Sequence, residues 1–543
     1  MCGIFGYMSS DKITQGVLQA INVEGMKCKS RGPDNTVTRK IGDNIFLMFH
    51  RLTINDTSEL GNQPIVHPDD YNITVICNGE IYNWRKLATS NNFKTKSTSD
   101  CEIIVHMYKK YGIEETVKSL DGVFAFILID STINKLYVAR DPIGVRSLYV
   151  GCSPGVISFG SECKTLDNIC NEIIQFKPGS YITIDTSNIP SSPRDIDFTN
   201  YYSREYEPID DKISNILPCI RHKLNLSIDK RLLSDRPIGC LLSGGLDSSL
   251  IAALVSNKLK TPLHTFSIGL EGAVDLKYAK IVSEHLGTVH SEYIITEEEM
   301  FNSIEDVVKT IETYDITTIR ASIPMFLLCK HIKNTTDITV LFSGEGSDEA
   351  SGSYLYFHNT PNETELQTEI LRLMKDLSYF DVLRSDKSTA SAGLEVRVPF
   401  LDKEFLEYYL GLLPKFKMPK TYSMEKYLLR KAFDIGDILP KEVLWRTKEG
   451  MSDGVSSQNK SWAEIIQDKV DTVITDEEFN EHKLRYTHNP PQFKEAYYYR
   501  KLFEKTLKNR SELLPYYWLP RWSGDITDPS ARILNVYDKA ANQ

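Results

Sequence analysis

The second residue of the chain is a cysteine, and its position rather than its type suggests chemistry. Cys2 follows Met1 and opens the run Cys2-Gly3-Ile4-Phe5-Gly6. Removal of the leading Met would place a thiol and a free α-amine on the same residue. An α-amine has a pKa of roughly 7.7 to 8.0, so near neutral pH it can take the thiol proton and return it to a leaving group. Such a residue could be a self-activated nucleophile, although a cysteine in second position, taken alone, is more often a chance occurrence.

Several short motifs follow Cys2 in a fixed order. They are Arg31-Gly32-Pro33-Asp34, His50-Arg51-Leu52, Asn78-Gly79-Glu80, Arg140-Asp141-Pro142-x-Gly144 and Gly160-Ser161-Glu162. Alone, Asn78-Gly79 is the sequence of a hairpin turn, and Arg51 or Asp100 is a surface ion-pair partner. Together with Cys2, the set resembles the class II glutamine amidotransferases with an N-terminal nucleophile, over about the first 185 residues.

This resemblance implies a glutaminase site. The side chain of Asn78 and the N–H of Gly79 would stabilise the oxyanion formed on the glutamine amide. Arg51 would pair with the glutamine carboxylate, while Glu80 and Asp100 would hold its ammonium. Leu52, Thr53, Ile54 and Asn55 would contribute mainly backbone groups to glutamine binding.

A second candidate site lies between an apolar run and a predicted helix. The run Ile238 to Leu242 leads into Ser243-Gly244-Gly245-Leu246-Asp247-Ser248-Ser249. Glycines let a loop turn tightly and aim backbone N–H groups at an anion. The G-x-x-x-x-G-K-[ST] pattern of P-loop proteins is absent, so transfer of a γ-phosphate is not expected. The motif resembles the PP-loop of ATP pyrophosphatases, which implies cleavage of ATP to AMP and pyrophosphate.

A similar arrangement recurs at a later apolar run. Val340-Leu341-Phe342 leads into Ser343-Gly344-Glu345-Gly346-Ser347-Asp348-Glu349, which resembles the signature of the asparagine synthetase family. The resemblance implies that Glu345 accepts a proton when ammonia attacks an aspartyl-AMP. It also implies that Asp247 and Asp348 bind Mg²⁺, since acids among phosphate-binding groups otherwise repel the phosphates.

Further blocks extend the resemblance to nearly the whole chain. Lys448, in Trp445-Arg446-x-Lys448-Glu449, would neutralise charge on the leaving phosphates. Leu241, Ile268, Ser343 and Gly344 match positions that contact adenosine, and Ser243, Gly244, Gly245 and Ser248 would bind phosphates. Arg320 and Arg397 are candidates for the carboxylates of aspartate, with a structural ion pair as an equal alternative. One departure is Ala350-Ser351-Gly352-Ser353-Tyr354, where the family commonly has Gly-Gly-Tyr or Gln-Gly-Tyr.

Two domains must position these sites. Residues 1–200 read as short β-type runs, such as Ile73 to Cys77 and Val123 to Ile129, with one helix near Asp100 to Tyr111, which indicates a layered sheet domain. Residues 201–543 alternate helices and strands, which indicates a parallel sheet followed by helices. The resemblance implies an αββα four-layer sandwich for the first domain and an α/β PP-loop fold with a helical extension for the second. A Pro- and Ser-containing stretch at 188–194 connects them.

Composition restricts the remaining classes of function. The 543 residues are 41% hydrophobic and 25% charged, with a formal net charge of −10, which argues against general binding of nucleic acid. We expect no membrane span and no secretory signal at the start, and hence a cytosolic protein. Its ten cysteines contain no C-x-x-C pair, so most are expected to be reduced. The sequence does not determine the oligomeric state, and a homodimer is one possibility.

The two sites together predict one reaction. Ammonia released from glutamine would reach a β-aspartyl-AMP through an enclosed apolar channel and form asparagine. A β-lactam synthetase or a related ligase is an alternative, although such enzymes often lose the terminal cysteine. A catalytically inactive binding protein on the same scaffold is a second alternative, against which the intact motifs argue. A phosphoribosyl or hexosamine amidotransferase would share only the first domain.

Overall fold

A computed structural model describes residues 1–446, 450, 454–457, 460–531 and 534. The chain divides into two compact units. The first comprises Met1–Arg204, Leu233–Pro237 and Thr389–Glu395, and the second comprises Glu205–Leu232, Ile238–Ser388 and Val396–Gln543.

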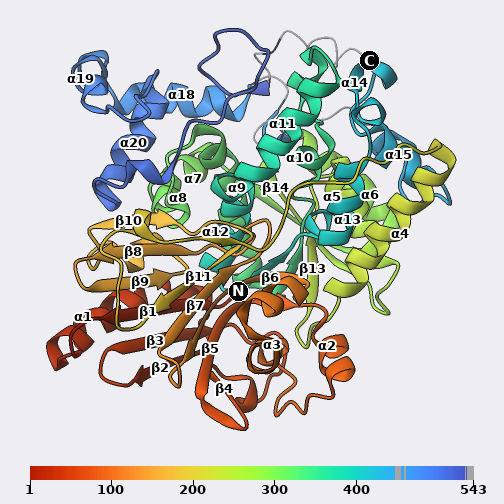
Figure 1. The fold of residues 1–543 in the computed structure, drawn as a ribbon. Helices are drawn as coiled ribbons and strands as arrows, with labels where there is room; N and C mark the ends of the chain where they lie inside the picture. Colours follow the sequence, from red (N-terminus) through yellow and green to blue (C-terminus); the bar gives the residue numbers. More distant parts are fainter. Residues whose placement is uncertain (447–449, 451–453, 458–459, 532–533, 535–543) are drawn as a thin grey trace. The chain divides into compact units, whose positions relative to one another are not determined.

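Two six-stranded antiparallel sheets form the centre of the first unit (Figure 1). In order across the sheet, one contains β10 (Glu172–Gln175), β8 (Tyr149–Ser153), β9 (Val156–Gly160), β1 (Gly3–Ser9), β3 (Ile45–Arg51) and β2 (Asn35–Ile41). The other contains β12 (Thr199–Asn200), β11 (Ser180–Asp185), β7 (Lys135–Arg140), β6 (Gly122–Asp130), β5 (Asp70–Ile81) and β4 (Ile65–His67).

The strand β6 explains why the two sheets stack. Ala125, Ile127 and Ile129 pack with Ile4 and Leu47 of the other sheet. The alternate residues Phe124, Phe126 and Leu128 face the opposite side and pack with residues of α3 (Ile103–Ser119). Because successive side chains of a strand point to opposite faces, a strand covered on both faces must be apolar throughout.

Helices cover both outer faces of this sandwich. α2 (Trp84–Asn91) and α3 cover the sheet that contains β5 and β6. On the outer side of the other sheet, Gly25 at the end of α1 (Gln15–Gly25) approaches Phe5 and Met48. The predicted αββα sandwich is confirmed.

One expected turn in this unit was wrong. Asn78 and Gly79 lie inside β5, opposite Ala125 and Phe124 of β6, and the strand continues to Ile81. A Cβ on Gly79 would lie 2.3 Å from the carbonyl oxygen of Val123. Glycine is therefore required here by close strand packing, not by a reversal of the chain.

The second unit is built on a five-stranded sheet. Its order is β15 (Val289–Ile295), β14 (His264–Leu270), β13 (Ile238–Leu241), β16 (Val340–Phe342) and β17 (Glu395–Arg397). β13 pairs in parallel with both β14 and β16, and β14 pairs in parallel with β15. The predicted α/β class is confirmed, although β15 and β17 were not expected from the sequence.

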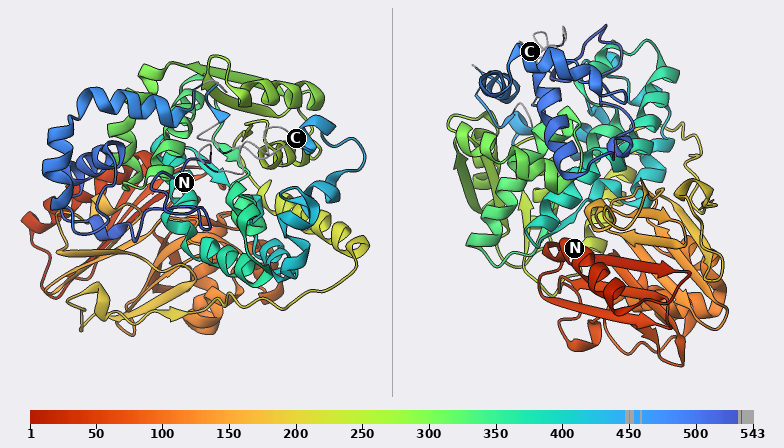
Figure 2. Two further views of the ribbon diagram at one scale, coloured as in Figure 1. Left: turned by 90° about the horizontal axis from the view of Figure 1, so that it is seen from above. Right: turned by 90° about the vertical axis from the view of Figure 1, so that its left-hand side faces the viewer.

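Helices connect and extend this sheet (Figures 1 and 2). Those before β17 are α4 (Ile213–Arg231), α5 (Leu246–Ser256), α6 (Val274–Leu286), α7 (Glu297–Asn302), α8 (Ile304–Ile311), α9 (Ile316–Thr335), α10 (Ser347–Ser351), α11 (Glu363–Asp376) and α12 (Asp381–Ser391). Those after it are α13 (Lys403–Gly411), α14 (Pro419–Tyr422), α15 (Tyr427–Phe433), α16 (Lys441–Leu444), α18 (Trp462–Val473), α19 (Asp476–His482) and α20 (Lys494–Thr506). α20 packs on both α18 and α8, so the predicted helical extension folds back onto the unit.

Candidate active sites

Cys2 is held at the start of the central strand β1 by backbone contacts. The backbone N–H of Leu52 donates a hydrogen bond to the Cys2 sulfur over 3.4 Å. Arg31 donates from Nε to the Cys2 carbonyl oxygen over 3.0 Å. These contacts fix both the thiol and the main chain of Cys2 beside the end of β3.

The motifs that follow Cys2 support this position. The Arg31 guanidinium also contacts the Glu162 carboxylate, with an N–O distance of 3.5 Å, and Ser161 Oγ accepts the N–H of Ile4 over 3.0 Å. In the 140–146 loop, Arg140 donates to three carbonyl oxygens, while Asp141 accepts four backbone N–H groups. Most of the motif residues therefore build the frame of the site.

Asn78 has the environment expected of an oxyanion donor. Its side chain is fully buried, and among the described residues neither its amide nitrogen nor its amide oxygen has a hydrogen-bond partner. Asn78 and Glu80 are two residues apart in β5 and share one face of the sheet. Burial raises the pKa of the Cys2 thiol, and the Glu80 carboxylate adds to this shift, so Glu80 lies within electrostatic reach of the thiol.

The predicted glutamine-binding residues lie around this position. Arg51 donates to the carbonyl oxygen of Ser58 and to Asn62 Oδ1, each over 2.8 Å. Glu80 accepts a hydrogen bond from Asn55, and Asp100 accepts the N–H of Ile81, each over 2.5 Å. The segment 52–55 is held mainly through its backbone. The N–H of Thr53 donates to the Asp34 carboxylate, and the carbonyl oxygen of Ile54 accepts the N–H of Asp235.

Met1 is buried, and its amine donates to the carbonyl oxygen of Leu394 over 3.3 Å. Burial lowers the pKa of this amine to about 6 and raises the pKa of the Cys2 thiol to about 11. While Met1 is attached, the thiol is therefore protonated at neutral pH, and Cys2 carries no α-amine of its own.

In the second unit, the loop after β13 folds around two serines. Ser248 Oγ accepts the N–H of Ser243 over 3.1 Å and lies 2.9 Å from Ser243 Oγ. Gly244 has a φ of 70°, and a Cβ there would lie 2.4 Å from Tyr278 and Ala279. The loop is thus a tight turn that delivers Asp247 to the first turn of α5.

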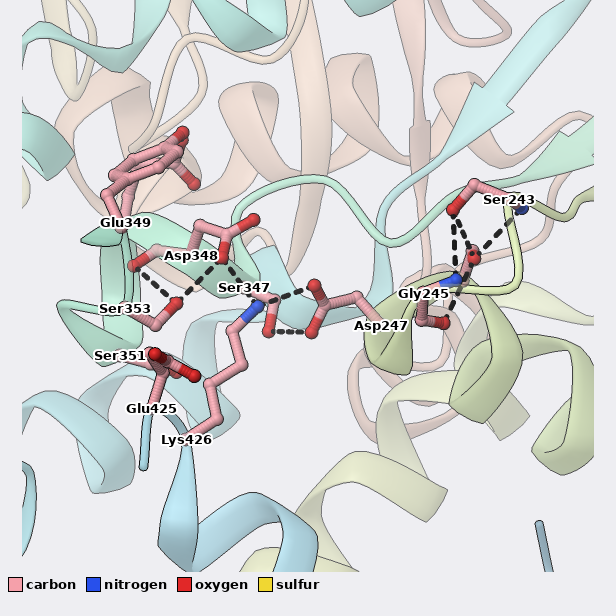
Figure 3. Close-up of polar contacts among 12 residues, drawn as sticks. Ser243, Gly245, Asp247, Ser347, Asp348, Glu349, Ser351, Ser353, Glu425 and Lys426 are labelled. Atoms are coloured by element: carbon pink, nitrogen blue, oxygen red, sulfur yellow. Dashed lines mark hydrogen bonds and ion pairs between the residues drawn. The ribbon is translucent and has the colours of Figure 1, made fainter. Parts of the chain in front are cut away.

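The two predicted metal-binding carboxylates converge on a lysine (Figure 3). Lys426 Nζ lies 2.5 Å from Asp247 Oδ2 and 2.7 Å from Asp348 Oδ1. Ser347 Oγ donates to Asp247 over 2.7 Å, and Ser353 Oγ donates to Asp348 over the same distance. The Lys426 ammonium occupies the space between the two carboxylates. Their oxygens are therefore oriented to bind a cation.

Glu345 is held in a fixed geometry by Arg384. The two guanidinium nitrogens of Arg384 lie 3.0 and 2.7 Å from the two carboxylate oxygens of Glu345, and Arg384 also contacts Asp381 at 2.8 Å. Burial raises the pKa of Glu345, and Arg384 opposes that shift. A carboxylate with a raised pKa is suited to accept a proton.

These residues line one cavity of about 220 Å³. Its walls contain most of the nucleotide-binding residues expected from the sequence, together with Glu345 and Asp348: Leu241, Ser243, Gly245, Asp247, Ser248, Ile268, Ser343 and Gly344. Gly244 shapes the loop behind this wall. Lys448 lies outside the described residues, so its predicted role stays a prediction.

The two arginines expected to bind aspartate are engaged by protein groups. Arg320 donates to Glu495 and Asp528, each over 2.8 Å, inside the second unit. Arg397 donates to the carbonyl oxygen of Arg231. Neither lines the cavity. For Arg320, the structure has the buried ion pair that the sequence left as the alternative.

Among the cavity residues that the sequence reasoning missed, Arg384 and Lys426 contact the predicted site carboxylates directly. A lone Arg or Lys in a predicted helix region carries no signal of its own. The sequence around Arg384 and Lys426 gives no other indication of a role. Their partners Glu345, Asp247 and Asp348 are distant along the chain and are brought to them only by folding.

The described ranges also limit other kinds of site. Within them, no group of three or more His, Cys, Asp or Glu side chains is arranged to hold a metal ion. None of the described helices combines the length and the apolar character that crossing a bilayer requires.

Known proteins resemble this chain along its full length. Residues 1–193 match the family described as glutamine amidotransferase domain, and residues 219–367 and 358–528 match the family described as asparagine synthase. An asparagine synthetase [glutamine-hydrolyzing] of Gallus gallus is 42% identical over 570 residues, which cover 100% of both chains. Proteins of the same description from Bos taurus and Homo sapiens are 41% and 40% identical, and cover 100% and 99% of this chain and 100% of their own. The chain therefore belongs to the family of glutamine-hydrolysing asparagine synthetases.

Proposed function

We propose that this protein makes asparagine from aspartate, with glutamine as the nitrogen donor and ATP as the source of energy. ATP, aspartate, glutamine and water would give AMP, pyrophosphate, asparagine and glutamate. The proposal rests on two features of one chain. One is a Cys2 site in which the buried Asn78 amide has no hydrogen-bond partner among the described residues, and the other is a cavity lined by Glu345 and the predicted nucleotide-binding residues.

In the glutaminase reaction, the Cys2 thiolate attacks the amide carbon of glutamine after Met1 has been removed. The α-amine of Cys2 takes the thiol proton and gives it to the departing ammonia. Asn78 and the N–H of Gly79 stabilise the oxyanion. The thioester left on Cys2 is hydrolysed by water to glutamate, with Arg51, Glu80 and Asp100 retaining the amino-acid end.

In the synthetase reaction, the side-chain carboxylate of aspartate attacks the α-phosphate of ATP and pyrophosphate leaves. Ser243, Gly245 and Ser248 bind the phosphates, and Asp247 and Asp348 would hold Mg²⁺, which neutralises phosphate charge when bound. Ammonia then attacks the aspartyl-AMP carbonyl, AMP leaves, and Glu345 accepts the proton from the attacking nitrogen. Lys448 remains the proposed cation for the leaving phosphates.

The distribution of cysteines supports a cytosolic location for this reaction. The ten cysteines are scattered along the chain without a disulfide-type spacing, and most are buried as free thiols.

Replacement of Cys2 by Ala tests the assignment of two separate reactions. Glutamine-dependent asparagine formation should be lost, whereas formation from added ammonium should continue, because the cavity of the second unit is unchanged. Cys219→Ala, at an exposed cysteine, is the matched control and should retain both activities. Retention of the glutamine-dependent activity by Cys2→Ala would exclude Cys2 as the nucleophile.

A further inference from the structure

Lys426 has a backbone conformation that lysine rarely adopts. It precedes α15 with a φ of 55°, in the left-handed region, and only 1% of its side chain is exposed. Non-glycine residues in this region are strained, and such strain persists only where surrounding contacts impose it.

The neighbours of Lys426 supply those contacts. Arg430 donates from Nε to the Glu425 carbonyl oxygen over 2.8 Å and from Nη1 to that of Leu444 over 2.6 Å. His358 lies 2.7 Å from the Glu425 carboxylate. The segment before α15 is therefore held on both sides, and the strained turn directs the lysine into the cavity (Figure 3).

The ammonium of Lys426 lies between two carboxylates of the cavity wall. It lies between Asp247 and Asp348, whose side chains are 14% and 16% exposed. The cavity wall also carries Asp275, Glu345, Glu349 and Asp381, so its carboxylates outnumber its cationic side chains. Without a cation between them, Asp247 and Asp348 would repel each other at reduced solvent screening.

A divalent cation and the ammonium cannot share this position. A divalent cation held by Asp247 and Asp348 would compete with the ammonium for these two carboxylates, and the two positive charges would repel at contact distance. Metal binding therefore requires that the ammonium leave, and a displaced buried ammonium needs another anion. The phosphates of a nucleotide are an anion that enters the same cavity under the proposed function.

We propose that Lys426 is a built-in counter-cation that competes with the divalent metal for Asp247 and Asp348. In the nucleotide-free protein, the Lys426 ammonium occupies the space between the two carboxylates and so keeps a metal ion from binding there. The metal gains the pair only together with phosphate groups that accept the ammonium, so metal and nucleotide enter as one unit. This inference rests on the proposed function only for the identity of the phosphate ligand.

Binding of Mn²⁺ to the protein without nucleotide tests the competition, measured by the electron paramagnetic resonance signal of free Mn²⁺. Lys426→Met should bind Mn²⁺ at least about tenfold more tightly than the unchanged protein, because the competing charge has been removed. Mn²⁺ should also raise the Tm of this variant by roughly 2–4 °C while leaving that of the unchanged protein nearly constant.

Lys387→Met is the matched control. Lys387 is a fully buried lysine paired with Glu312 and does not line the cavity, so its loss should leave Mn²⁺ affinity unchanged. Adding Asp348→Asn to Lys426→Met should abolish the gain. If Lys426→Met does not fold, Lys426→Gln, which retains more of the polar side chain, provides the same comparison.

Equal or weaker Mn²⁺ binding by the folded Lys426 variants would overturn the proposal, since it would mean that the ammonium does not oppose the metal. The measurement contains no ATP, glutamine or aspartate. Failure of asparagine formation would therefore leave this result intact, and a negative Mn²⁺ result would leave the proposed reaction intact.

Discussion

Asn78 and Gln63 are two buried amides of the first unit with opposite surroundings. Gln63 accepts the N–H of Cys77 over 2.6 Å and donates to its carbonyl oxygen over 3.1 Å. The side-chain amide of Asn78, the residue after Cys77, has no such partner among the described residues. A buried amide without a partner costs stability, which is expected where the group serves a ligand instead of the fold.

Substitution of these two residues should separate catalysis from stability. Asn78→Ala should reduce glutaminase turnover by about 10²- to 10³-fold, the usual effect of one oxyanion donor, with little change in Tm. Gln63→Ala should instead destabilise the protein by about 1–3 kcal/mol, because it leaves buried backbone groups of Cys77 unpaired. Turnover with glutamine and thermal unfolding of both variants check this. A stable, fully active Asn78→Ala would contradict the oxyanion role.

At this scale, sequence reasoning worked best where neighbouring residues act together. Ser243 to Ser248 form one loop, so their spacing alone predicts that their side chains lie close together. Lys426 could not be found in this way, because its role depends on Asp247 and Asp348, which are brought to it by tertiary structure. Arg320 illustrates the reverse case, since its charge is used by Glu495 and Asp528.

Two adjacent parallel strands bring the two loops of the predicted ATP site together. β13 and β16 pair in register, Ile238 with Val340, and each ends in a Ser-Gly loop. Loops that leave the same edge of a parallel sheet meet beside each other. The loops here touch so closely that a Cβ on Gly344 would lie 2.8 Å from the Cβ of Asp247.

Gly244→Ala should therefore stop the ATP-dependent reaction and leave glutaminase turnover unchanged. The added Cβ would meet the backbone of Tyr278 and Ala279 and displace the phosphate-binding loop. Gly272→Ala is the control, since Gly272 has a similar φ of 76° but no atom within 4 Å of an added Cβ. It should cost roughly 1–2 kcal/mol of backbone strain and retain pyrophosphate release. Equal loss of synthesis in both variants would mean that strain, and not the loop position, causes the effect.

Element types followed from the sequence more reliably than their ends. The apolar run Val123 to Ile129 became β6, and the apolar run Ile238 to Leu242 became β13, which ends at Leu241. The end of β5 was misplaced because Asn-Gly is also the preferred sequence of a hairpin turn. The side chains of β15 are exposed or half-buried except at Ile295, and they show no clear alternation of apolar and polar residues, so periodicity could not reveal this strand.

For the whole molecule, the compact units are not continuous segments of the chain. Leu233–Pro237 and Thr389–Glu395 belong to the first unit although they are far along the sequence. Such short segments have no periodicity of their own, and their placement depends on contacts such as that between Arg146 and Glu395, at 3.3 Å. A boundary read from composition alone cannot include them.

The proposed reaction requires that nitrogen from the glutamine amide reach an adenylated aspartate on this one chain. Incubation with aspartate, ATP, Mg²⁺ and glutamine labelled with ¹⁵N at the amide tests it directly, with mass spectrometry of the amino acids and chromatography of the nucleotides. We predict ¹⁵N in the side-chain amide of asparagine and one AMP per asparagine formed. Unlabelled asparagine, or ADP as the nucleotide product, would contradict the account.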